Sequence, residues 1–367
     1  MCLFEDNVFV GNNVGLSLYS SDNNSIYNNV FENNNKGIVI DSVNNTAFSN
    51  SIIGGDEGIV IYEIKNIIKD NILFNIKNIG ISIYSHENVV KNNTIFGVKE
   101  YAVNLFAFGN NVTYNFLKNN YRGLYINADE NLFVYNNITG SKYNGIVVVG
   151  SLNIIENNKI AGSGNYTDIG LTGSYNTISR NDISKFKNGI YINGHRNLVY
   201  INKINVKSTG ISLKGNYNLI LKNTITCNNL GISVNGHSHN VNSNKVISKS
   251  SGLKLNGNKN KIVSNNIKFR INDIIIHDNR NSFSKNQISG NKKYGLPFSD
   301  KNKISKNMNN KNKHHGIKVN GNVDRLCGIH GLKIAGGPNI VTNNKLGKLS
   351  NKKICVYGYK NKIRKNK

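Results

Sequence analysis

The sequence predicts an all-β fold, a single-stranded parallel β-helix of about 17 coils with 21–23 residues each. Two observations carry this prediction: a short apolar phrase recurs along the whole chain, and asparagine recurs at two fixed distances after it. The phrase reads Gly-Ile-Tyr-Ile at Gly189 and Gly-Ile-Ser-Leu at Gly210. Repeat periods of about 20–50 residues mark solenoids, propellers or arrays. We therefore expect one continuous solenoid over residues 1–367 rather than several separate domains.

The first residue of the phrase serves as the anchor of each copy. Fifteen of the sixteen intervals between successive anchors measure 21 to 23 residues, and one measures 15. The seventeen anchors stand at positions 15, 37, 58, 80, 102, 123, 145, 168, 189, 210, 231, 252, 273, 295, 316, 331 and 353.

Each copy predicts three short strands. The residues one and three after the anchor are apolar in all seventeen copies, as Ile211 and Leu213 are. Alternation with a period of two marks a strand with one buried face. Further apolar columns fall ten and fifteen residues after the anchor, at Ile220 and Ile225 in the same copy. Three inward-pointing strands per turn, stacked coil on coil, predict parallel sheets.

Asparagine supports the same coil. It stands eight residues after the anchor in 14 of 17 copies and thirteen residues after it in 15, although it makes up only about one residue in five. Asparagine tolerates the left-handed backbone angles of turns, and stacked side-chain amides can hydrogen-bond from coil to coil. We expect asparagine ladders in the turns, with Asn88, Asn93, Asn218 and Asn223 among their members.

Composition excludes several protein classes. The counts of 35 Gly, 2 Pro and 4 Cys exclude collagen-like, proline-rich and disulfide-scaffold chains, and the scattered cysteines are expected to be reduced. No apolar run is long enough to span a membrane, and no signal peptide or anchor is visible. The chain begins and ends within a coil, so we expect a fragment of a longer polypeptide or a rod that stacks end to end.

Charge divides the chain into two parts. Residues 1–150 hold 9 Lys+Arg and 13 Asp+Glu, whereas residues 151–367 hold 37 and 7. The basic part predicts attraction to an anionic cell-surface polymer; a lysine-rich compositional bias is the alternative. Only 7 of the 46 basic residues are arginine and no aromatic–basic platform accompanies them, so specific nucleic-acid binding is not expected.

Aromatic side chains recur on the outward side of the first strand. Several stand four residues after the anchor, in a row that Asp41 interrupts, and others stand two residues after it. Exposed aromatic faces could stack on sugar rings; the alternative is that tyrosine is a good strand former and stacks on itself across coils. The candidate carbohydrate-binding residues are Tyr19, Tyr62, Tyr84, Phe106, Tyr125 and Tyr191.

Residues 297–330 depart from the repeat. Pro297 falls on a strand position, and Met308 and Ile329 stand where the second asparagine is expected. Repeat decay is one interpretation, and a functional site is the other. The candidate acid–base residues of this stretch are Asp324, Arg325 and His330.

The phrase that runs from Gly210 through Asn218, Ile220, Asn223 and Ile225 resembles the right-handed parallel β-helix repeats of the pectin-lyase-like superfamily. It resembles more closely NosD-like repeats and the Asn-rich, adhesin-like surface proteins. The resemblance covers nearly the whole chain and implies a right-handed coil and an extracellular or cell-surface location. It is specific for the fold and weak for function, because one fold carries many activities.

The enzymes of that superfamily include polygalacturonases, pectate lyases and C5-epimerases of uronic-acid polymers. Their Asp-Asp, Gly-His-Gly, Arg-Ile-Lys and Asp-Pro-His-Asp motifs are absent from this sequence. The nearest approach to an acidic calcium cluster is Asp41 with Glu63, which fits a solvated face better.

No metal or other cofactor is expected. Copper, which the NosD resemblance implies, favours clusters of Met, Cys or His. The sequence holds only two methionines, and its close histidine pairs are His237 with His239 and His314 with His315. His195 shares a column with His237 but stands two coils away, at about 10 Å.

These observations favour a non-catalytic, adhesin-like surface β-helix that binds carbohydrate or another cell-surface partner. The alternative function is a polysaccharide lyase, hydrolase or epimerase.

Overall fold

The computed structural model describes residues 2–270, 274–276, 280–289, 297–298, 302–310, 317–319, 332–335, 339–344, 354–357 and 360–366. The chain divides into two compact units, Met1–Ile190 and Tyr191–Lys367, here called the first and the second unit. All regular structure in the described residues is β-strand. No helix in this part of the chain is long and apolar enough to cross a membrane. The all-β prediction is confirmed.

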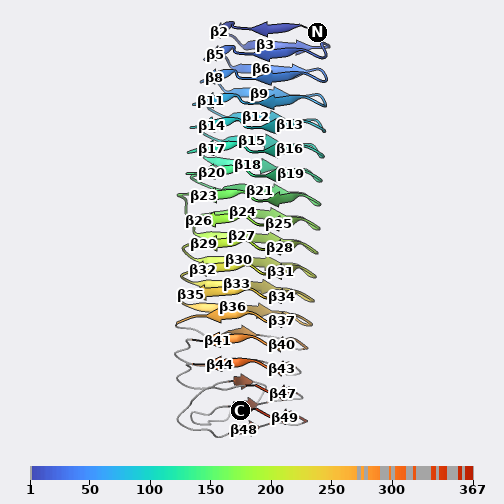
Figure 1. Ribbon diagram of the computed structural model, residues 1–367, viewed down its shortest axis with the longest axis vertical. Helices are drawn as coiled ribbons and strands as arrows, with labels where there is room; N and C mark the ends of the chain where they lie inside the picture. The colour runs from blue at the N-terminus through green and yellow to red at the C-terminus, as the bar shows by residue number, and fades with distance from the viewer. Residues whose placement is uncertain are drawn as a thin grey trace. The chain divides into compact units, whose positions relative to one another are not determined.

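In the first unit each coil contributes one short strand to each of three parallel sheets (Figure 1). Sheet A contains β1 (Leu3–Glu5), β4 (Ser25–Tyr27), β7 (Thr46–Phe48), β10 (Ile67–Lys69), β13 (Val89–Lys91), β16 (Asn111–Thr113), β19 (Leu132–Val134), β22 (Ile154–Glu156) and β25 (Thr177–Ser179). Sheet B contains β2 (Val8–Val10), β5 (Val30–Glu32), β8 (Ser51–Ile53), β11 (Ile72–Phe74), β14 (Thr94–Phe96), β17 (Phe116–Lys118), β20 (Asn137–Thr139), β23 (Lys159–Ala161) and β26 (Asp182–Ser184). Sheet C contains β3 (Val14–Tyr19), β6 (Lys36–Asp41), β9 (Glu57–Ile61), β12 (Ile79–Ile83), β15 (Tyr101–Leu105), β18 (Arg122–Ile126), β21 (Ile146–Val149) and β24 (Thr167–Thr172).

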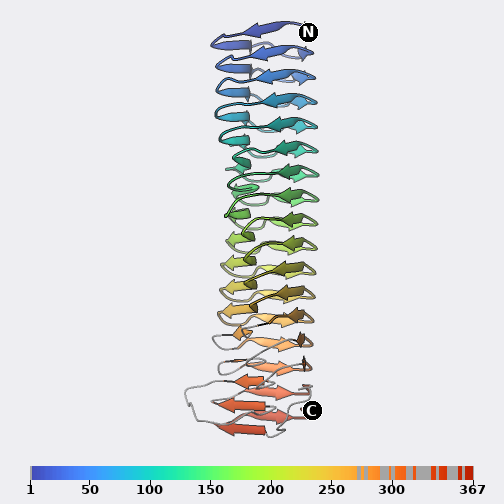
Figure 2. The same cartoon turned by 90° about the vertical axis from the view of Figure 1, so that its left-hand side faces the viewer.

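The second unit repeats this arrangement (Figure 2). In sequence, β27 (Asn188–Asn193) of sheet C contains the boundary between the units. Its A strands are β28 (Leu198–Tyr200), β31 (Leu219–Leu221), β34 (Asn240–Asn242), β37 (Lys261–Val263), β40 (Ser282–Ser284), β43 (Lys303–Ser305), β47 (Ile340–Thr342) and β49 (Lys362–Arg364). Its B strands are β29 (Lys203–Asn205), β32 (Thr224–Cys227), β35 (Lys245–Ser248), β38 (Asn266–Lys268), β41 (Gln287–Ser289) and β44 (Met308–Asn310). Its C strands are β30 (Thr209–Lys214), β33 (Leu230–Asn235), β36 (Ser251–Asn256) and β39 (Ile275–Ile276). A further parallel sheet contains β42 (Pro297–Phe298), β45 (Ile317–Val319), β46 (Leu332–Ala335) and β48 (Ile354–Tyr357).

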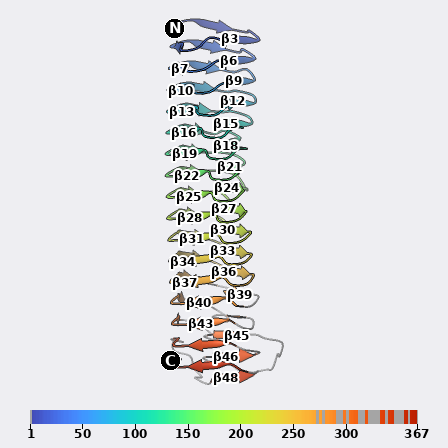
Figure 3. The same ribbon diagram turned by 90° about the vertical axis from the view of Figure 1, so that its right-hand side faces the viewer.

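Successive coils pair in register. In sheet A, Ile68 of β10 lies opposite Val90 of β13, and both side chains are fully buried. In sheet C, Ile81 lies opposite Val103 in the same way. Within each unit, Figure 3 shows the A strands in one column and the C strands in another. The parallel β-helix with three strands per coil is therefore confirmed.

The number of coils differs slightly from the prediction. Strands β1 to β39 group into thirteen successive triplets, so thirteen coils carry all three strands in the described residues. Each of the last four anchors, at 295, 316, 331 and 353, is followed by a strand of the further sheet instead.

The 15-residue interval falls where the strand pairing changes. In sheet A, β43 pairs directly with β47, whereas β45 pairs with β46 in the further sheet. In the described part of the short copy between the anchors at 316 and 331, residues 317–319 form one strand of the further sheet and no strand belongs to sheet A.

The asparagine ladders are present at two corners of each coil. Asn93 accepts a hydrogen bond from the backbone N of Asn71 (3.0 Å) and donates from its own backbone N to Oδ1 of Asn115 (3.0 Å). Its side-chain Nδ2 donates to the carbonyl of Ile68 (2.9 Å). Asn88, Asn218 and Asn223 are equally buried and make ladder bonds of the same kind. The ladders thus satisfy backbone groups that the coil buries at its corners.

The left-handed backbone angle falls on a different residue from the predicted one. It belongs to the residue before the ladder asparagine, such as Glu87 (φ 58°) or Tyr217 (φ 60°). In the first copy, anchor counting placed Asn23 in the ladder, but Asn23 has φ 60° and Asn24 makes the ladder bond. Ladder asparagines are therefore selected for their amide groups rather than for their backbone angles.

The ladder of the second unit is not interrupted where the sequence suggested. Anchor counting placed Lys303 and Met308 at the two ladder positions. The structure places Asn302 and Asn307 there, one residue earlier, and Asn302 donates directly to Oδ1 of Asn339 (3.1 Å). The apparent loss of asparagine was an error of register.

Close approach of neighbouring coils explains the glycine at anchors such as Gly58. A Cβ atom at Gly58 would lie 2.4 Å from the carbonyl oxygen of Gly80 and 2.6 Å from Cδ2 of Leu73. Both distances are shorter than real Cβ contacts allow.

Asp168 occupies one anchor in place of glycine. The residue is fully buried, and neither carboxylate oxygen has a hydrogen-bond partner. Burial raises the pKa of this carboxyl well above its usual value of 3.8. Burial therefore favours the neutral form of Asp168 in the folded chain.

Replacing Asp168 with glycine is expected to stabilise the first unit by about 1–3 kcal/mol at pH 7, because burying an unpartnered polar group is unfavourable. Because the pKa of Asp168 is raised in the folded chain, the stability difference between the two proteins depends on pH. Stability is lost as pH rises from 3.8 towards the folded-state pKa, since the unfolded chain ionises first. Urea unfolding of the wild type and of Asp168→Gly at pH 4, 5.5 and 7 measures this; a stability difference that does not grow with pH would contradict it.

Candidate functional site

The predicted aromatic row is present on the outer surface of the first unit. Tyr62, Tyr84 and Phe106 follow directly after β9, β12 and β15, and each is about two-fifths exposed. The rings of Tyr62 and Tyr84 stack with their centroids 5.2 Å apart, and those of Tyr84 and Phe106 stack at 5.1 Å. Three aromatic faces therefore form one continuous stack.

The other members of the predicted set lie apart from this stack. Tyr19 is 74% exposed and pairs in register with Asp41, so the acidic side chain separates it from Tyr62. Tyr125 is half-buried, lies opposite Asn104 and packs at a tilt against Tyr101. Tyr191 is half-buried and belongs to the second unit.

A second aromatic stack runs beside the first and was not predicted. His86 and Phe108 stand two residues after Tyr84 and Phe106, and their rings stack at 4.9 Å. Aromatic rings in the same column of consecutive copies were the signal that could have revealed this pair.

The two stacks line one surface groove of about 750 Å³. Tyr84 and Phe106 contribute one pair of rings, and His86 and Phe108 contribute the other. The full lining consists of Tyr84, Ser85, His86, Phe106, Ala107, Phe108, Asn127, Ala128, Asp129, Glu130 and Val149.

Two carboxylates complete the groove. Asp129 and Glu130 lie at the turn after β18, and Oδ1 of Asp129 accepts a hydrogen bond from the backbone N of Ser151 (2.7 Å). Burial, followed by the charge of Glu57, raises the pKa of the Tyr84 hydroxyl, so this phenol stays protonated at neutral pH. The groove thus combines apolar ring faces with hydroxyl, amide and carboxylate groups.

The candidate acid–base residues Asp324, Arg325 and His330 lie outside the described residues. Asp41 and Glu63 are half-buried, and Glu63 accepts a hydrogen bond from Asn66 through its carbonyl. Among the described residues there is no group of three or more His, Cys, Asp or Glu side chains that could hold a metal ion.

Comparison with known families gives two matches. The family described as "Periplasmic copper-binding protein (NosD)" matches residues 80–240. The family described as "Right handed beta helix region" matches residues 1–120. Among curated proteins, none matches this chain.

The described residues do not fit a copper site. Copper prefers clustered His, Met or Cys ligands. Asn216 separates His195 from His237, and Nδ1 of each histidine accepts a backbone hydrogen bond from the next coil. His239 is buried, with its Nδ1 bonded to the backbone N of Asn218.

Several solved structures are similar to the chain. The Dettilon tailspike protein is 15% identical with a TM-score of 0.43, covering 72% of this chain and 58% of its own. A tailspike protein mutant of E. coli bacteriophage HK620, in complex with a hexasaccharide, is 11% identical with a TM-score of 0.45, covering 97% and 72%. The periplasmic alginate epimerase AlgG is 11% identical with a TM-score of 0.28, covering 93% and 76%. The chain therefore spans less than two thirds of the Dettilon protein.

Proposed function

We propose that this chain, a right-handed parallel β-helix repeat protein with NosD-like repeats, is a non-catalytic, adhesin-like surface protein that binds carbohydrate in the groove of the first unit. The observation that carries the proposal is the pair of aromatic stacks that line one groove. The chain is one continuous solenoid in this proposal, and it acts outside the cytoplasm, where a cell-surface glycan is accessible.

The chemistry of the groove suits a sugar. Binding sites for small ligands are lined mainly by apolar and aromatic side chains, with a few polar groups that fix orientation. The faces of Tyr84 and Phe108 offer apolar surface to the carbon-bound hydrogens of a sugar ring. Asn127 and Glu130 offer hydrogen-bonding groups to its hydroxyls. Because Asp129 and Glu130 are both acidic, the groove favours a neutral glycan over an anionic one.

A glycan array with single alanine variants tests this proposal. Tyr84→Ala or Phe108→Ala is expected to weaken binding to the recognised glycan by about tenfold, the loss typical of an aromatic contact at the centre of an interface. Both side chains lie on the surface, with 42% and 53% of their area exposed, so their removal leaves the core intact.

The matched control for these variants is Tyr135→Ala. Tyr114 and Tyr135 also stack across neighbouring coils, at 4.9 Å, and both are about half exposed, but neither lines the groove. Binding that survives both groove substitutions, or that falls equally in the control, would remove the aromatic stacks from the proposal.

The alternative function is a polysaccharide-modifying enzyme, and the paired carboxylates in the groove are the observation that favours it. Glycoside hydrolysis uses two carboxyl groups, one on each side of the scissile bond. The hydrogen bond from Ser151 to Asp129 favours a structural role for that carboxylate instead. Incubation with neutral and uronic-acid polymers, with and without calcium, separates the two functions. Shortened or unsaturated products that disappear in Glu130→Gln would establish the enzyme.

A further inference from the structure

The charged side chains in residues 191–272, the first half of the second unit, are all basic. Residues 191–272 contain twelve Lys and Arg residues and no Asp or Glu. Long side chains of one sign on adjacent coils repel one another, because the coils are only about 4.8 Å apart.

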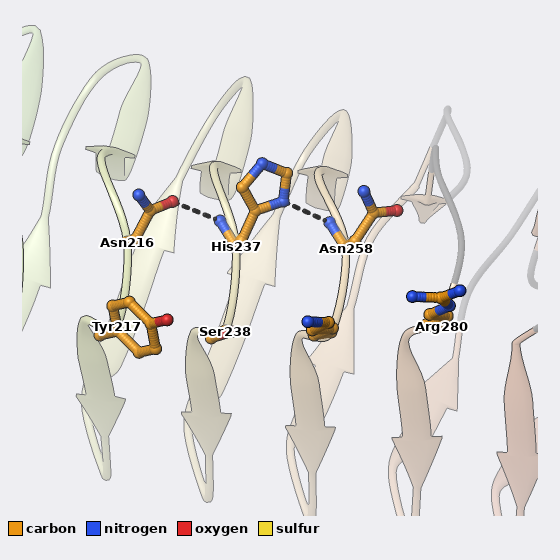
Figure 4. Close-up of a pocket in the computed structure, with 7 residues that line it drawn as sticks. Asn216, Tyr217, His237, Ser238, Asn258 and Arg280 are labelled. Atoms are coloured by element: carbon orange, nitrogen blue, oxygen red, sulfur yellow. Dashed lines mark hydrogen bonds between the residues drawn. The ribbon is translucent and has the colours of Figure 1, made fainter.

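One pocket of this unit brings together Lys259, which is one of these twelve cations, and Arg280, which follows them in the sequence. It has a volume of about 470 Å³ and is lined by Asn216, Tyr217, His237, Ser238, Asn258, Lys259 and Arg280. Figure 4 shows the lining side chains in two parallel rows, with Asn216, His237 and Asn258 in one row and Tyr217, Ser238 and Arg280 in the other.

Backbone geometry fixes the second row. Ser238, Lys259 and Arg280 have φ angles of 58°, 61° and 60°, so the same left-handed turn recurs in three consecutive coils. The turn therefore projects the side chains of Lys259 and Arg280 from equivalent positions, one coil apart.

Hydrogen bonds fix the first row. The backbone N of His237 donates to Oδ1 of Asn216 (2.8 Å), and the backbone N of Asn258 donates to Nδ1 of His237 (2.9 Å) (Figure 4). Because Nδ1 accepts, the neutral ring carries its proton on Nε2. The exposed edge of His237 is therefore a hydrogen-bond donor.

At the equivalent turn of the first unit, a cation is paired with a carboxylate from the next coil. There Lys65 and Glu87 occupy the same column in consecutive coils and form an ion pair at 3.9 Å. Lys259 and Arg280 are instead two cations in consecutive coils. Neither forms an ion pair within the described residues, and the described residues of the second unit include no carboxylate side chain.

We propose that this pocket is a binding site for a phosphate-type oxyanion, with Lys259 and Arg280 as its charged ligands and His237 and Ser238 as further donors. A phosphate group carries a charge of about −1.5 to −2 at neutral pH and several acceptor oxygens. It therefore compensates two cations at once, whereas a carboxylate compensates one. The arginine fork adds directional hydrogen bonds that a lysine alone does not supply.

Isothermal titration of the full chain with inorganic phosphate, at constant ionic strength, tests the site. Arg280→Gln and Lys259→Gln are each expected to weaken phosphate binding by roughly tenfold or more, the loss of a charge-assisted hydrogen bond. His237→Asn keeps the side-chain acceptor for Asn258, because Asn216 fills this role in the preceding coil. It removes only the Nε2 donor, and a loss of about threefold is expected. Acetate is expected to bind more weakly than phosphate.

Lys222→Gln is the matched control, because Lys222 also has a left-handed backbone angle (φ 55°) but stands at the other ladder corner, before Asn223. There it lies over the ring of Tyr200, outside the pocket. Phosphate binding that falls equally in Lys222→Gln and Arg280→Gln would overturn the proposal in favour of diffuse attraction. Phosphate and acetate heats that are both indistinguishable from dilution would also overturn it. A second titration with linear polyphosphate identifies the source: tighter binding per phosphate group than inorganic phosphate supports a polymer-borne ligand, and equal binding supports the free ion.

Discussion

Replacing Asn93 with alanine is expected to destabilise the first unit by about 3–5 kcal/mol. The substitution removes the acceptor for both the backbone N and the Nδ2 of Asn71, each at 3.0 Å. It also leaves the buried carbonyl of Ile68 without the amide that now donates to it. Each buried group that loses its hydrogen-bond partner costs about 1–3 kcal/mol. The substitution removes a partner from three such groups: the backbone N and the Nδ2 of Asn71, and the carbonyl of Ile68.

Denaturant unfolding of Asn93→Ala measures the total effect, and hydrogen exchange at the backbone amide of Asn71 measures the local one. The control is Asn92→Gly, because Asn92 is exposed and has φ 55°, which glycine adopts freely. The control is expected to change stability by less than about 1 kcal/mol. Equal destabilisation by both substitutions would show that the ladder bonds contribute nothing beyond the turn.

Lowering the pH from 7 to 4 is expected to destabilise the second unit by about 3 kcal/mol through His239 alone. His239 occupies a ladder position and is 1% exposed, and its Nε2 atom has no hydrogen-bond partner. Burial lowers its pKa from 6.5 to about 4. The backbone of Gly215 acts in the opposite direction and raises the pKa of His239, but less than burial lowers it. It makes no hydrogen bond to Nε2.

The sign follows from the two pKa values. Between pH 6.5 and pH 4 the unfolded chain binds a proton that the folded chain does not, so stability is complete above pH 6.5 and falls as the pH approaches 4. His239→Asn restores the usual ladder residue and removes the titrating group. The stability difference between the variant and the wild type should therefore grow as the pH falls. Identical pH profiles for the two proteins would contradict the assignment.

The repeat made most of the fold predictable. Apolar residues at fixed distances from the anchor identified all three strands of a coil, because a solenoid places the same position of every copy in the same environment. Register inside the turns was harder to predict. Asn23 and Asn24 are chemically identical, and only the hydrogen bond to Asn45 distinguishes the ladder member from the left-handed one.

The candidate site was predicted in part. Tyr62, Tyr84 and Phe106 follow a strand, where the period of two identifies the outward side. His86 and Phe108 lie in the turn beyond it, where alternation no longer indicates direction. The pocket around Arg280 depends on left-handed turns in three coils, and no residue type in the sequence marks these turns because serine, lysine and arginine all occupy them.

The central claim is that the groove of the first unit binds a glycan without altering it. Saturation-transfer NMR tests this most directly, because saturation passes from the protein only to ligand molecules that bind, and most strongly to the ligand protons nearest the protein. We predict transfer to the ring protons of the recognised glycan in the wild type and in Tyr135→Ala, strong reduction in Tyr84→Ala and Phe108→Ala, and a glycan of unchanged length afterwards. Transfer that is equal in all four proteins, or a glycan that is shortened during the measurement, would contradict the claim.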